Sequence, residues 1–296
     1  MIICIVGPTG IGKSKLACDV ALKVGGEIVN GDAFQIYKEM DIGTAKPSMN
    51  ERRIVPHHLF DYVEPTYNFS SFDYQCSIRK KIDELENKGV PIIVCGGTGM
   101  YLKAGFYDFD LRKEEVKFDM SKYDDYTNEE LHNELKKVDE EEAKKIHMNN
   151  RKRVLRALQI FLSSGKKKSS IIEEQKHEPI YDVHFIGLTR DREELNDIIN
   201  KRVDKMFEMG LLEEVKNLMN KYPHDLHSFQ AIGYKEIIEG LENNDSIDNI
   251  KEKIKKNTRN YAKRQMTYFK HQMNVTWFNS SKEAFEYIIN LFKKED

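Results

Sequence analysis

The sequence predicts an α/β protein in which helices flank a parallel sheet and a small helical insertion domain is added. The first observation behind this prediction is an apolar run at Ile2–Val6, which is followed at once by a glycine-rich loop and a helical pattern. The second is that further short apolar runs end in glycine turns and alternate with amphipathic segments, as in βαβ units. The third is a length of 296 residues with 40% hydrophobic residues, which is enough for a sizeable core.

The first loop has the pattern G-x-x-x-x-G-K-[ST] between the expected strand and the expected helix. Glycines let such a loop turn several backbone N–H groups inward, and the following helix adds positive charge at its N-terminus. The lysine supplies a full charge, and the Ser14 hydroxyl can ligate Mg²⁺. The fold is therefore predicted to be P-loop NTPase-like. The predicted phosphate-binding residues are Gly7, Pro8, Thr9, Gly10, Ile11, Gly12, Lys13 and Ser14.

Two later strands are expected to end beside this loop. The strand at 27–30 is followed by Gly31 and Asp32, and the strand at 90–95 is followed by a second glycine turn, 96–99. Ligands of open α/β sheets bind at the carboxyl ends of the strands, so we expect Asp32 to have a chemical role rather than only to cap a turn. The strand at 90–95 does not end in the Asp with which an NTPase helps to hold Mg²⁺. This absence argues against ordinary ATP hydrolysis.

The middle of the chain is predicted to leave the core and return to it. The P-loop core is expected to comprise 1–106 and 148–296, with a helical insertion at 107–147. Within the insertion, Thr127 and Glu130 form a capping box at the start of a helix. A basic helix start follows at 151–156, 165–170 is expected to be a flexible loop, and 183–188 is expected to be a further strand.

An arginine continues the apolar stripe of the helix that starts near Leu195. Leu195, Ile198 and Ile199 are spaced as one helix face, and Arg202 is the next position on it. An inward-facing arginine must be paired with an acid or bind an anion, and the sequence leaves both readings open. His57 and His58 are adjacent and lack a completing carboxylate motif, so we expect structural or hydrogen-bonding roles rather than a metal site.

Charge and composition limit the partners. With a net charge of −2, the protein as a whole does not attract polyanions, so contact with nucleic acid would need local basic clusters. The helix expected at 250–270 carries eight Lys or Arg residues against the single acid Glu252, which favours a phosphate-backbone surface. Four scattered cysteines and a first residue that leads directly into a core strand predict a reducing, cytoplasmic location, without a signal peptide or membrane partner.

Several motifs occur in order over nearly the whole chain: GPTGIGKS, the Asp32 turn, DIGTAKP (41–47), PHHL, GGTGMY (96–101), RALQ, the Arg202 helix, AIGYKE (231–236) and NTRNYAKRQMTYF. Together they resemble the tRNA dimethylallyltransferase family. The resemblance implies transfer of a dimethylallyl group from its diphosphate to N6 of the adenosine at position 37, just 3′ of the anticodon. The implied acceptors are tRNAs that read codons beginning with U, and the other product is diphosphate.

The resemblance also implies roles for residues. Thr9, Lys13, Asp32 and Arg202 would be catalytic, with Asp32 as general base and the P-loop and Arg202 binding the diphosphate. Mg²⁺ would be the cofactor, with Ser14 as its ligand. The anticodon stem-loop would contact the insertion, and the enzyme would act as a monomer. The implied tRNA-binding residues are Asp32, Ala33, Phe34, Gln35, Thr98, Lys152, Arg153, Val154, Leu155, Arg156, Gln230, Ala231, Ile232, Gly233, Tyr234 and Lys235.

Ala33 replaces a serine that is usual in the family, and Phe34 stands where a smaller or polar residue is common; both leave Asp32 intact. The alternatives are an adenylate isopentenyltransferase acting on free nucleotides, a P-loop nucleotide kinase and a catalytically silent RNA-binding protein. The first would not need the basic helix. A kinase would need an arginine-bearing lid, and Arg112 is the only arginine between Asp108 and Lys145.

Overall fold

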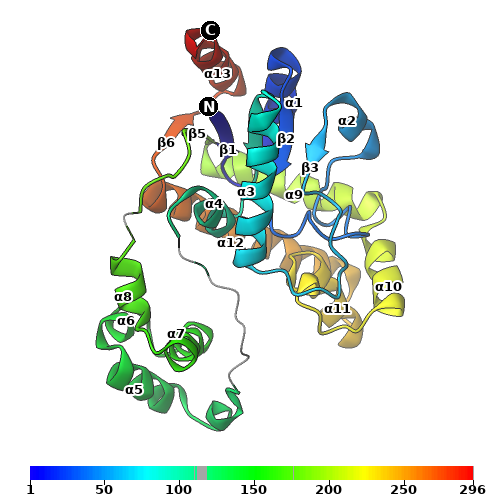
Figure 1. Cartoon of the computed structure of the whole chain (residues 1–296). Helices are drawn as coiled ribbons and strands as arrows, with labels where there is room; N and C mark the ends of the chain where they lie inside the picture. The colour runs from blue at the N-terminus through cyan, green and yellow to red at the C-terminus, as the bar shows by residue number, and fades with distance from the viewer. Residues whose placement is uncertain (110, 112–118, 176, 296) are drawn as a thin grey trace. The chain divides into compact units, whose positions relative to one another are not determined.

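The computed structural model describes residues 1–109, 111, 119–175 and 177–295 (Figure 1). The chain divides into a larger unit, Met1–Tyr107 with Pro179–Asp296, and a smaller unit, Asp108–Glu178. The expected insertion ended at 147, whereas the structure continues the smaller unit to Glu178. The reason is that the helix carrying Val154 and Leu158 buries its apolar face in the core of the smaller unit. Part of the predicted insertion, 110 and 112–118, lies outside the described residues.

The strands of the described residues form one six-stranded parallel sheet in the larger unit, with the order β3-β2-β4-β1-β5-β6. The sequence predicted β1, β2 and β5 with their observed bounds and β4 with a slightly longer range, but it predicted neither β3 nor β6. The strands are β1 (Ile2–Val6), β2 (Glu27–Asn30), β3 (His57–His58), β4 (Ile92–Cys95), β5 (Val183–Leu188) and β6 (Val275–Phe278).

The order of the strands brings three loops together. Strand β4 lies between β1 and β2, and Cys95 at its end is in register with Ile5 on one side and Asn30 on the other. The loops that follow β1, β2 and β4 therefore emerge side by side at the carboxyl edge of the sheet, where ligands of such folds bind.

Helices cover both faces of the sheet (Figure 1). Ile3 and Ile5 pack with the buried faces of α1 and α13, whereas Cys4 and Val6 belong to the core formed with α3, α4, α10 and α11. Residues of α9 and α12 contribute to both cores, so these two helices lie across the carboxyl edge. The helices of the larger unit are α1 (Lys13–Val24), α2 (Met49–Ile54), α3 (Ser71–Asn87), α4 (Gly99–Phe106), α9 (Arg192–Glu208), α10 (Leu211–Lys221), α11 (Tyr234–Glu242), α12 (Ile247–Gln272) and α13 (Ser281–Glu295).

The smaller unit has its own core, formed by buried apolar side chains of three helices. The predicted capping box is confirmed, because the Thr127 hydroxyl accepts a hydrogen bond from the Glu130 N–H at 3.2 Å. The expected flexible loop at 165–170 is wrong in its second half, since a short helix begins at Lys168, whose ammonium pairs with Glu142. The helices of the smaller unit are α5 (Asn128–Val138), α6 (Glu140–Lys145), α7 (Arg151–Ser164) and α8 (Lys168–Glu173).

Both histidines of β3 make hydrogen bonds within the larger unit. His57 Nδ1 lies 2.7 Å from the Val55 carbonyl oxygen, and His58 Nε2 pairs with the Glu27 carboxylate of the neighbouring strand. Among the residues that the structure describes, no helix combines the length and the apolar character needed to cross a bilayer.

Candidate active site

The loop between β1 and α1 has the backbone of a phosphate cradle. Gly7, Gly10 and Gly12 have φ values of 136°, 83° and 101°, in the region that favours glycine. A Cβ on Gly7 would lie 2.7 Å from the Leu188 carbonyl oxygen, so β5 also requires glycine there. Helix α1 begins at Lys13, directly after this loop, and its first turn directs N–H groups toward the loop. The strand and helix that the motif requires are therefore both present.

Lys13 is a partly desolvated cation beside the loop. Its ammonium donates a hydrogen bond to the Pro8 carbonyl oxygen at 2.8 Å. Burial lowers the pKa of Lys13 to about 8, an effect that Cys95 and Asp32 oppose and Arg202 reinforces. Lys13, Asp32 and Arg202 therefore lie within electrostatic reach of one another. An incoming polyanion would raise the pKa of Lys13 again.

The Asp32 carboxylate is held by its own turn. Its Oδ1 accepts a hydrogen bond from the Phe34 N–H at 2.9 Å. The buried Asn30 side chain accepts from the Asp32 N–H at 2.8 Å and donates to the carbonyl oxygens of Asp32 and Leu59. This frame fixes the carboxylate at the tip of β2.

The turns after β2 and β4 are in backbone contact. Gly31 donates to the Cys95 carbonyl oxygen at 2.8 Å, and a Cβ on Gly96 would lie 2.0 Å from the Gly31 carbonyl oxygen. The Thr98 hydroxyl accepts from the Ala33 N–H at 3.0 Å. The second glycine turn therefore lies at the same edge of the sheet as the first, as the sequence predicted.

Arg202 projects from α9 toward the same place. Leu195 and Ile199 are buried on the predicted stripe, and burial lowers the pKa of the Arg202 guanidinium while Asp32 raises it. No carboxylate in the described part of the chain forms an ion pair with Arg202. A partly buried cation without a paired acid is a site for an anion from outside the protein. Of the two readings left open by the sequence, this geometry favours anion binding.

The donors for a metal ion are few. Ser14 is exposed at the start of α1. Strand β4 ends in Cys95, and burial raises the pKa of its thiol to about 11, although nearby Lys13 opposes the shift. The described residues contain no cluster of three or more His, Cys, Asp or Glu side chains suited to a metal ion. One hydroxyl beside the cradle fits a Mg²⁺ ion that takes most of its oxygen ligands from a bound diphosphate and water.

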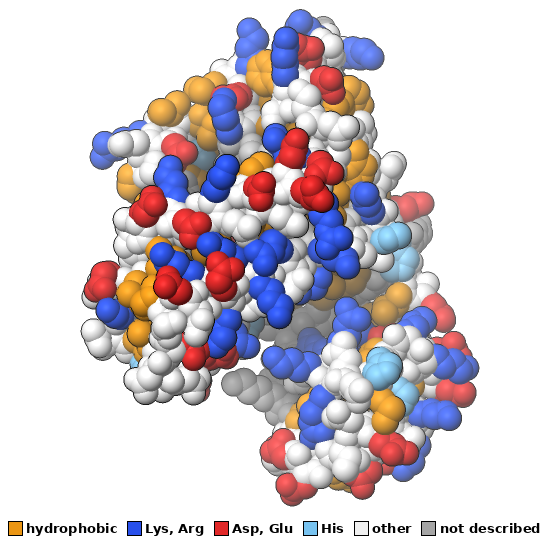
Figure 2. All heavy atoms as spheres, turned by 180° about the vertical axis from the view of Figure 1, so that it is seen from behind, with side chains coloured by type: hydrophobic (Ala, Val, Ile, Leu, Met, Phe, Trp, Pro, Cys, Tyr) orange, Lys and Arg blue, Asp and Glu red, His pale blue; other side chains and the backbone are white. Residues whose placement is uncertain are grey.

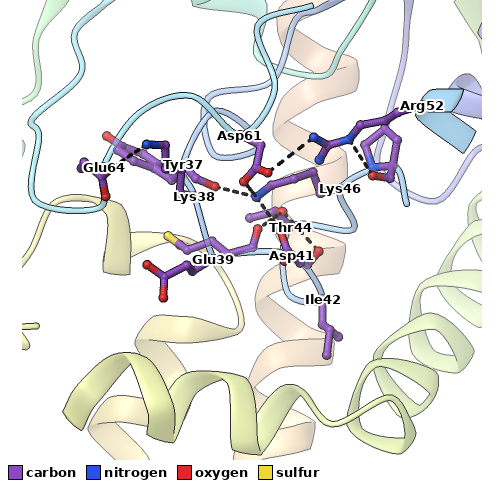
Figure 3. Close-up of polar contacts among 12 residues, drawn as sticks. Tyr37, Lys38, Glu39, Asp41, Ile42, Thr44, Lys46, Arg52, Asp61 and Glu64 are labelled. Atoms are coloured by element: carbon purple, nitrogen blue, oxygen red, sulfur yellow. Dashed lines mark hydrogen bonds and ion pairs between the residues drawn. The ribbon is translucent and has the colours of Figure 1, made fainter. Parts of the chain in front are cut away.

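The 41–47 motif is a braced loop. The Lys46 ammonium lies 2.6 Å from Asp41 Oδ1 and 2.8 Å from Asp61 Oδ1, and its side chain is only 1% exposed (Figure 3). The Gln35 amide donates to the carbonyl oxygens of Thr44 and Ala45. The loop therefore supports the segment that begins at Asp32.

A second brace joins this loop to the 231–236 motif. The Glu214 carboxylate accepts hydrogen bonds from the N–H groups of Asp41, Ile42 and Gly43 and from the Tyr234 hydroxyl. A Cβ on Gly43 would lie 2.4 Å from the Tyr234 ring. These motif residues hold one another in place.

Burial removes several predicted tRNA contacts. The side chains of Ala231, Tyr234 and Val154 are in the cores of their units, so they cannot reach a tRNA. Gly233 is buried, and Ile232 and Leu155 are partly buried and pack against those cores. In these two segments the exposed predicted residues are Gln230, Lys235, Lys152, Arg153 and Arg156.

The basic helix α12 divides into bracing and free cations. Lys255 pairs with Asp204 at 2.9 Å, and Arg259 donates to the Asn200 side chain, so both residues fasten α12 to α9. Lys256, Lys263 and Lys270 are exposed, follow one another at intervals of about two helical turns and form no ion pair with any described residue. Figure 2 shows Lys and Arg side chains gathering on part of the rear face of the larger unit.

The sequence reasoning missed two residues of α12 at the crevice. Gln265 is 5% exposed and bonds to both glycine turns, and Tyr261 lies beside Thr98. A signal was present, because Gln265 interrupts the buried stripe formed by Ala262 and Phe269, as Arg202 continues the stripe of α9.

Comparison with known proteins identifies the family of this chain. Residues 35–272 match the family described as IPP transferase. A "tRNA dimethylallyltransferase" of Bacillus cereus is 45% identical over 93% of this chain and 88% of its own length, and one of Bacillus anthracis is 44% identical over 93% and 89%.

Solved structures give the same result. A tRNA isopentenylpyrophosphate transferase from Staphylococcus epidermidis is 39% identical, with a TM-score of 0.75 over 100% of this chain and 99% of that one. A eukaryotic dimethylallyltransferase acting on tRNA is 29% identical, with a TM-score of 0.86 over 99% of this chain and 79% of that one. By sequence and by structure, this chain belongs to the IPP transferase family.

Proposed function

We propose that this chain transfers a dimethylallyl group from dimethylallyl diphosphate to N6 of the adenosine 3′-adjacent to the anticodon, position 37, in tRNAs that read codons beginning with U. The names of its relatives support an enzyme that prenylates tRNA. The observation that carries the proposal is that Lys13, Arg202 and Asp32 lie within electrostatic reach of one another at the carboxyl edge of the sheet.

The two cations serve the diphosphate. The P-loop N–H groups, the Thr9 hydroxyl and Lys13 would hold it in the ground state, and Arg202 would neutralise the charge that grows as the C1–O bond breaks. Stabilisation of this kind is worth on the order of 3 kcal/mol for one well-placed donor. A Mg²⁺ ion held by Ser14 would supply further charge neutralisation of the leaving group.

The carboxylate serves the acceptor. The N6 lone pair forms a bond to C1 of the dimethylallyl group while the C1–O electron pair leaves with diphosphate, and the displaced N6 proton passes to Asp32. The adenosine must be flipped out of the anticodon stack to reach this carboxylate, at an unstacking cost of a few kcal/mol. Thr98 and the backbone of 33–35 lie beside Asp32 and would contact the base.

The tRNA backbone needs cations outside the crevice. Exposed Lys256, Lys263 and Lys270 of α12 are our candidates in the larger unit. In the smaller unit, exposed Lys152 and Arg153 would contact the anticodon stem-loop. We propose that one cytoplasmic, monomeric chain carries out the reaction.

A single comparison of acceptors tests the function. The protein is incubated with labelled dimethylallyl diphosphate, Mg²⁺ and either unmodified tRNA or free AMP. We expect label in the tRNA and in N6-dimethylallyladenosine after digestion, with AMP unlabelled. Label in AMP alone would indicate an adenylate isopentenyltransferase. Label in neither acceptor would contradict prenyl transfer.

A further inference from the structure

Gln265 joins the two glycine turns with both ends of its side-chain amide. Its Oε1 accepts a hydrogen bond from the Thr9 N–H at 2.9 Å, and its Nε2 donates to the Gly97 carbonyl oxygen at 2.9 Å. An N–H only donates and a carbonyl only accepts, so the partners fix the orientation of the amide. Only a side chain that presents a donor and an acceptor side by side satisfies both turns.

The turns are built to admit this side chain. A Cβ on Gly97 would lie 2.2 Å from Gln265 Nε2, and a Cβ on Gly99 would lie 2.2 Å from the Tyr268 ring of the same helix. A side chain at Gly97 would therefore displace the Gln265 amide, and one at Gly99 would displace the Tyr268 ring. Glycine is required here by the close approach of α12.

The same helix also lies near the Asp32 turn. Tyr261, one turn before Gln265, lies close to Gln265 and Thr98. The Thr98 hydroxyl accepts a hydrogen bond from the N–H of Ala33, directly after Asp32. Helix α12 therefore contacts the phosphate loop through Gln265 and lies beside the turn that carries the carboxylate.

We propose that Gln265 is a positioning residue that fixes the phosphate loop relative to the Asp32 turn, and so sets the distance between the diphosphate and the acceptor amine. This proposal rests on the proposed function. Gln265 touches neither substrate; it acts through Thr9 and Gly97. A displacement of about 1 Å between reacting groups can cost about 10²-fold in rate, so the loss of this link should reduce the chemical step more than substrate binding.

The main variant is Gln265→Met, which keeps the side-chain volume and removes both hydrogen bonds. The matched control is Gln272→Met on the same helix, where the amide is exposed and accepts from the Lys103 ammonium at 3.0 Å. We expect Gln265→Met to lower the single-turnover rate by about 10- to 100-fold, with tRNA affinity within about twofold of wild type. The control should match wild type. An unchanged single-turnover rate for Gln265→Met would overturn the proposal. A fall in tRNA affinity as large as the fall in rate would also overturn it, because that result indicates unfolding.

A second variant separates positioning from general structural damage. In Gln265→Glu the protonated carboxyl group is a donor and acceptor like the amide, whereas the ionised form has only acceptors. The rate of Gln265→Glu divided by that of Gln265→Met should therefore rise as the pH falls. The division removes the effect of pH on Asp32. A ratio that does not depend on pH would contradict the proposal.

Hydrogen–deuterium exchange tests the link without any turnover. The peptide containing Thr9 should exchange faster in Gln265→Met than in wild type or in Gln272→Met, because the Thr9 N–H loses its acceptor. Equal exchange in all three would overturn the inference even if the enzyme transfers dimethylallyl groups. If Gln265→Met exchanges faster than wild type but the wild-type protein does not modify tRNA, the link through Gln265 stands and only the proposed function is refuted.

Discussion

The lowered pKa of Lys13 should make both the stability and the proposed diphosphate binding depend on pH. The shift from 10.5 to about 8 corresponds to about 3 kcal/mol of unfavourable free energy for the charged form in the folded, ligand-free protein. Between these two values the unfolded chain binds more protons than the folded one, so stability rises with pH across that window. Below pH 8 the cost is fully present.

Replacement of this lysine should therefore stabilise the free protein and impair its function. At pH 7, Lys13→Met is expected to raise the free energy of unfolding by up to about 3 kcal/mol, less the lost hydrogen bond to Pro8. The gain should shrink between pH 8 and 10.5, where Lys13 loses its proton in the folded state. Urea unfolding at several pH values measures this. The control is Lys15→Met, which removes an exposed lysine of the same helix that pairs with Asp19.

The same group should govern affinity for dimethylallyl diphosphate. About a tenth of Lys13 is neutral at pH 7 and about nine-tenths at pH 9, by the usual titration relation. Affinity in the absence of tRNA, measured by calorimetry, is expected to fall toward tenfold per pH unit above pH 8, with proton uptake on binding. A flat affinity from pH 7 to 9.5, or a Lys13→Met protein no more stable than Lys15→Met, would refute the reasoning.

Three further predictions concern the reaction and the tRNA. Asp32→Asn should reduce the single-turnover rate by ~10² to 10⁴ with little change in tRNA affinity, because only the proton acceptor is lost. Arg202→Gln should reduce kcat/KM for dimethylallyl diphosphate by about 10² to 10³, because the departing diphosphate loses one charged donor. Combined replacement of Lys256, Lys263 and Lys270 by Ala should weaken tRNA binding and reduce the slope of log affinity against log salt by roughly 2 to 3.

Each of these three predictions has a result that would contradict it, and the lysine variant also has a control. An Asp32→Asn protein with the wild-type single-turnover rate would rule out the general-base role. Wild-type kcat/KM in Arg202→Gln would return that residue to a structural role. For the lysines of α12, Lys282→Ala on α13 is an exposed control, and an unaltered salt slope in the triple variant would mean that the α12 face does not bind phosphates.

Much of the sheet could be predicted because the information is local. The apolar runs of β1, β2 and β5 are bounded by glycine or polar residues, and each was predicted with its observed ends. Strand β6 was missed because it is short, only partly buried and lies at the edge of the sheet. The end of the smaller unit was missed because the apolar face of α7 would suit either core.

The site could be predicted only where chemistry is carried by a local pattern. The P-loop spacing and the position of Asp32 at a strand tip are visible in the sequence. Arg202 was found because a charge stands on an apolar stripe, but the absence of a partner acid among the described residues required the structure. Gln265 was missed because its partners are backbone groups, one of them on Thr9 at the other end of the chain.

The most direct measurement is a crystal structure with a non-cleavable thio analogue of dimethylallyl diphosphate and an anticodon stem-loop. The account predicts Lys13 Nζ and the Arg202 guanidinium in contact with diphosphate oxygens, and an Asp32 oxygen about 2.6–3.2 Å from N6 of a flipped adenine. A diphosphate bound away from the phosphate loop, or an adenine amine facing a group other than Asp32, would contradict it.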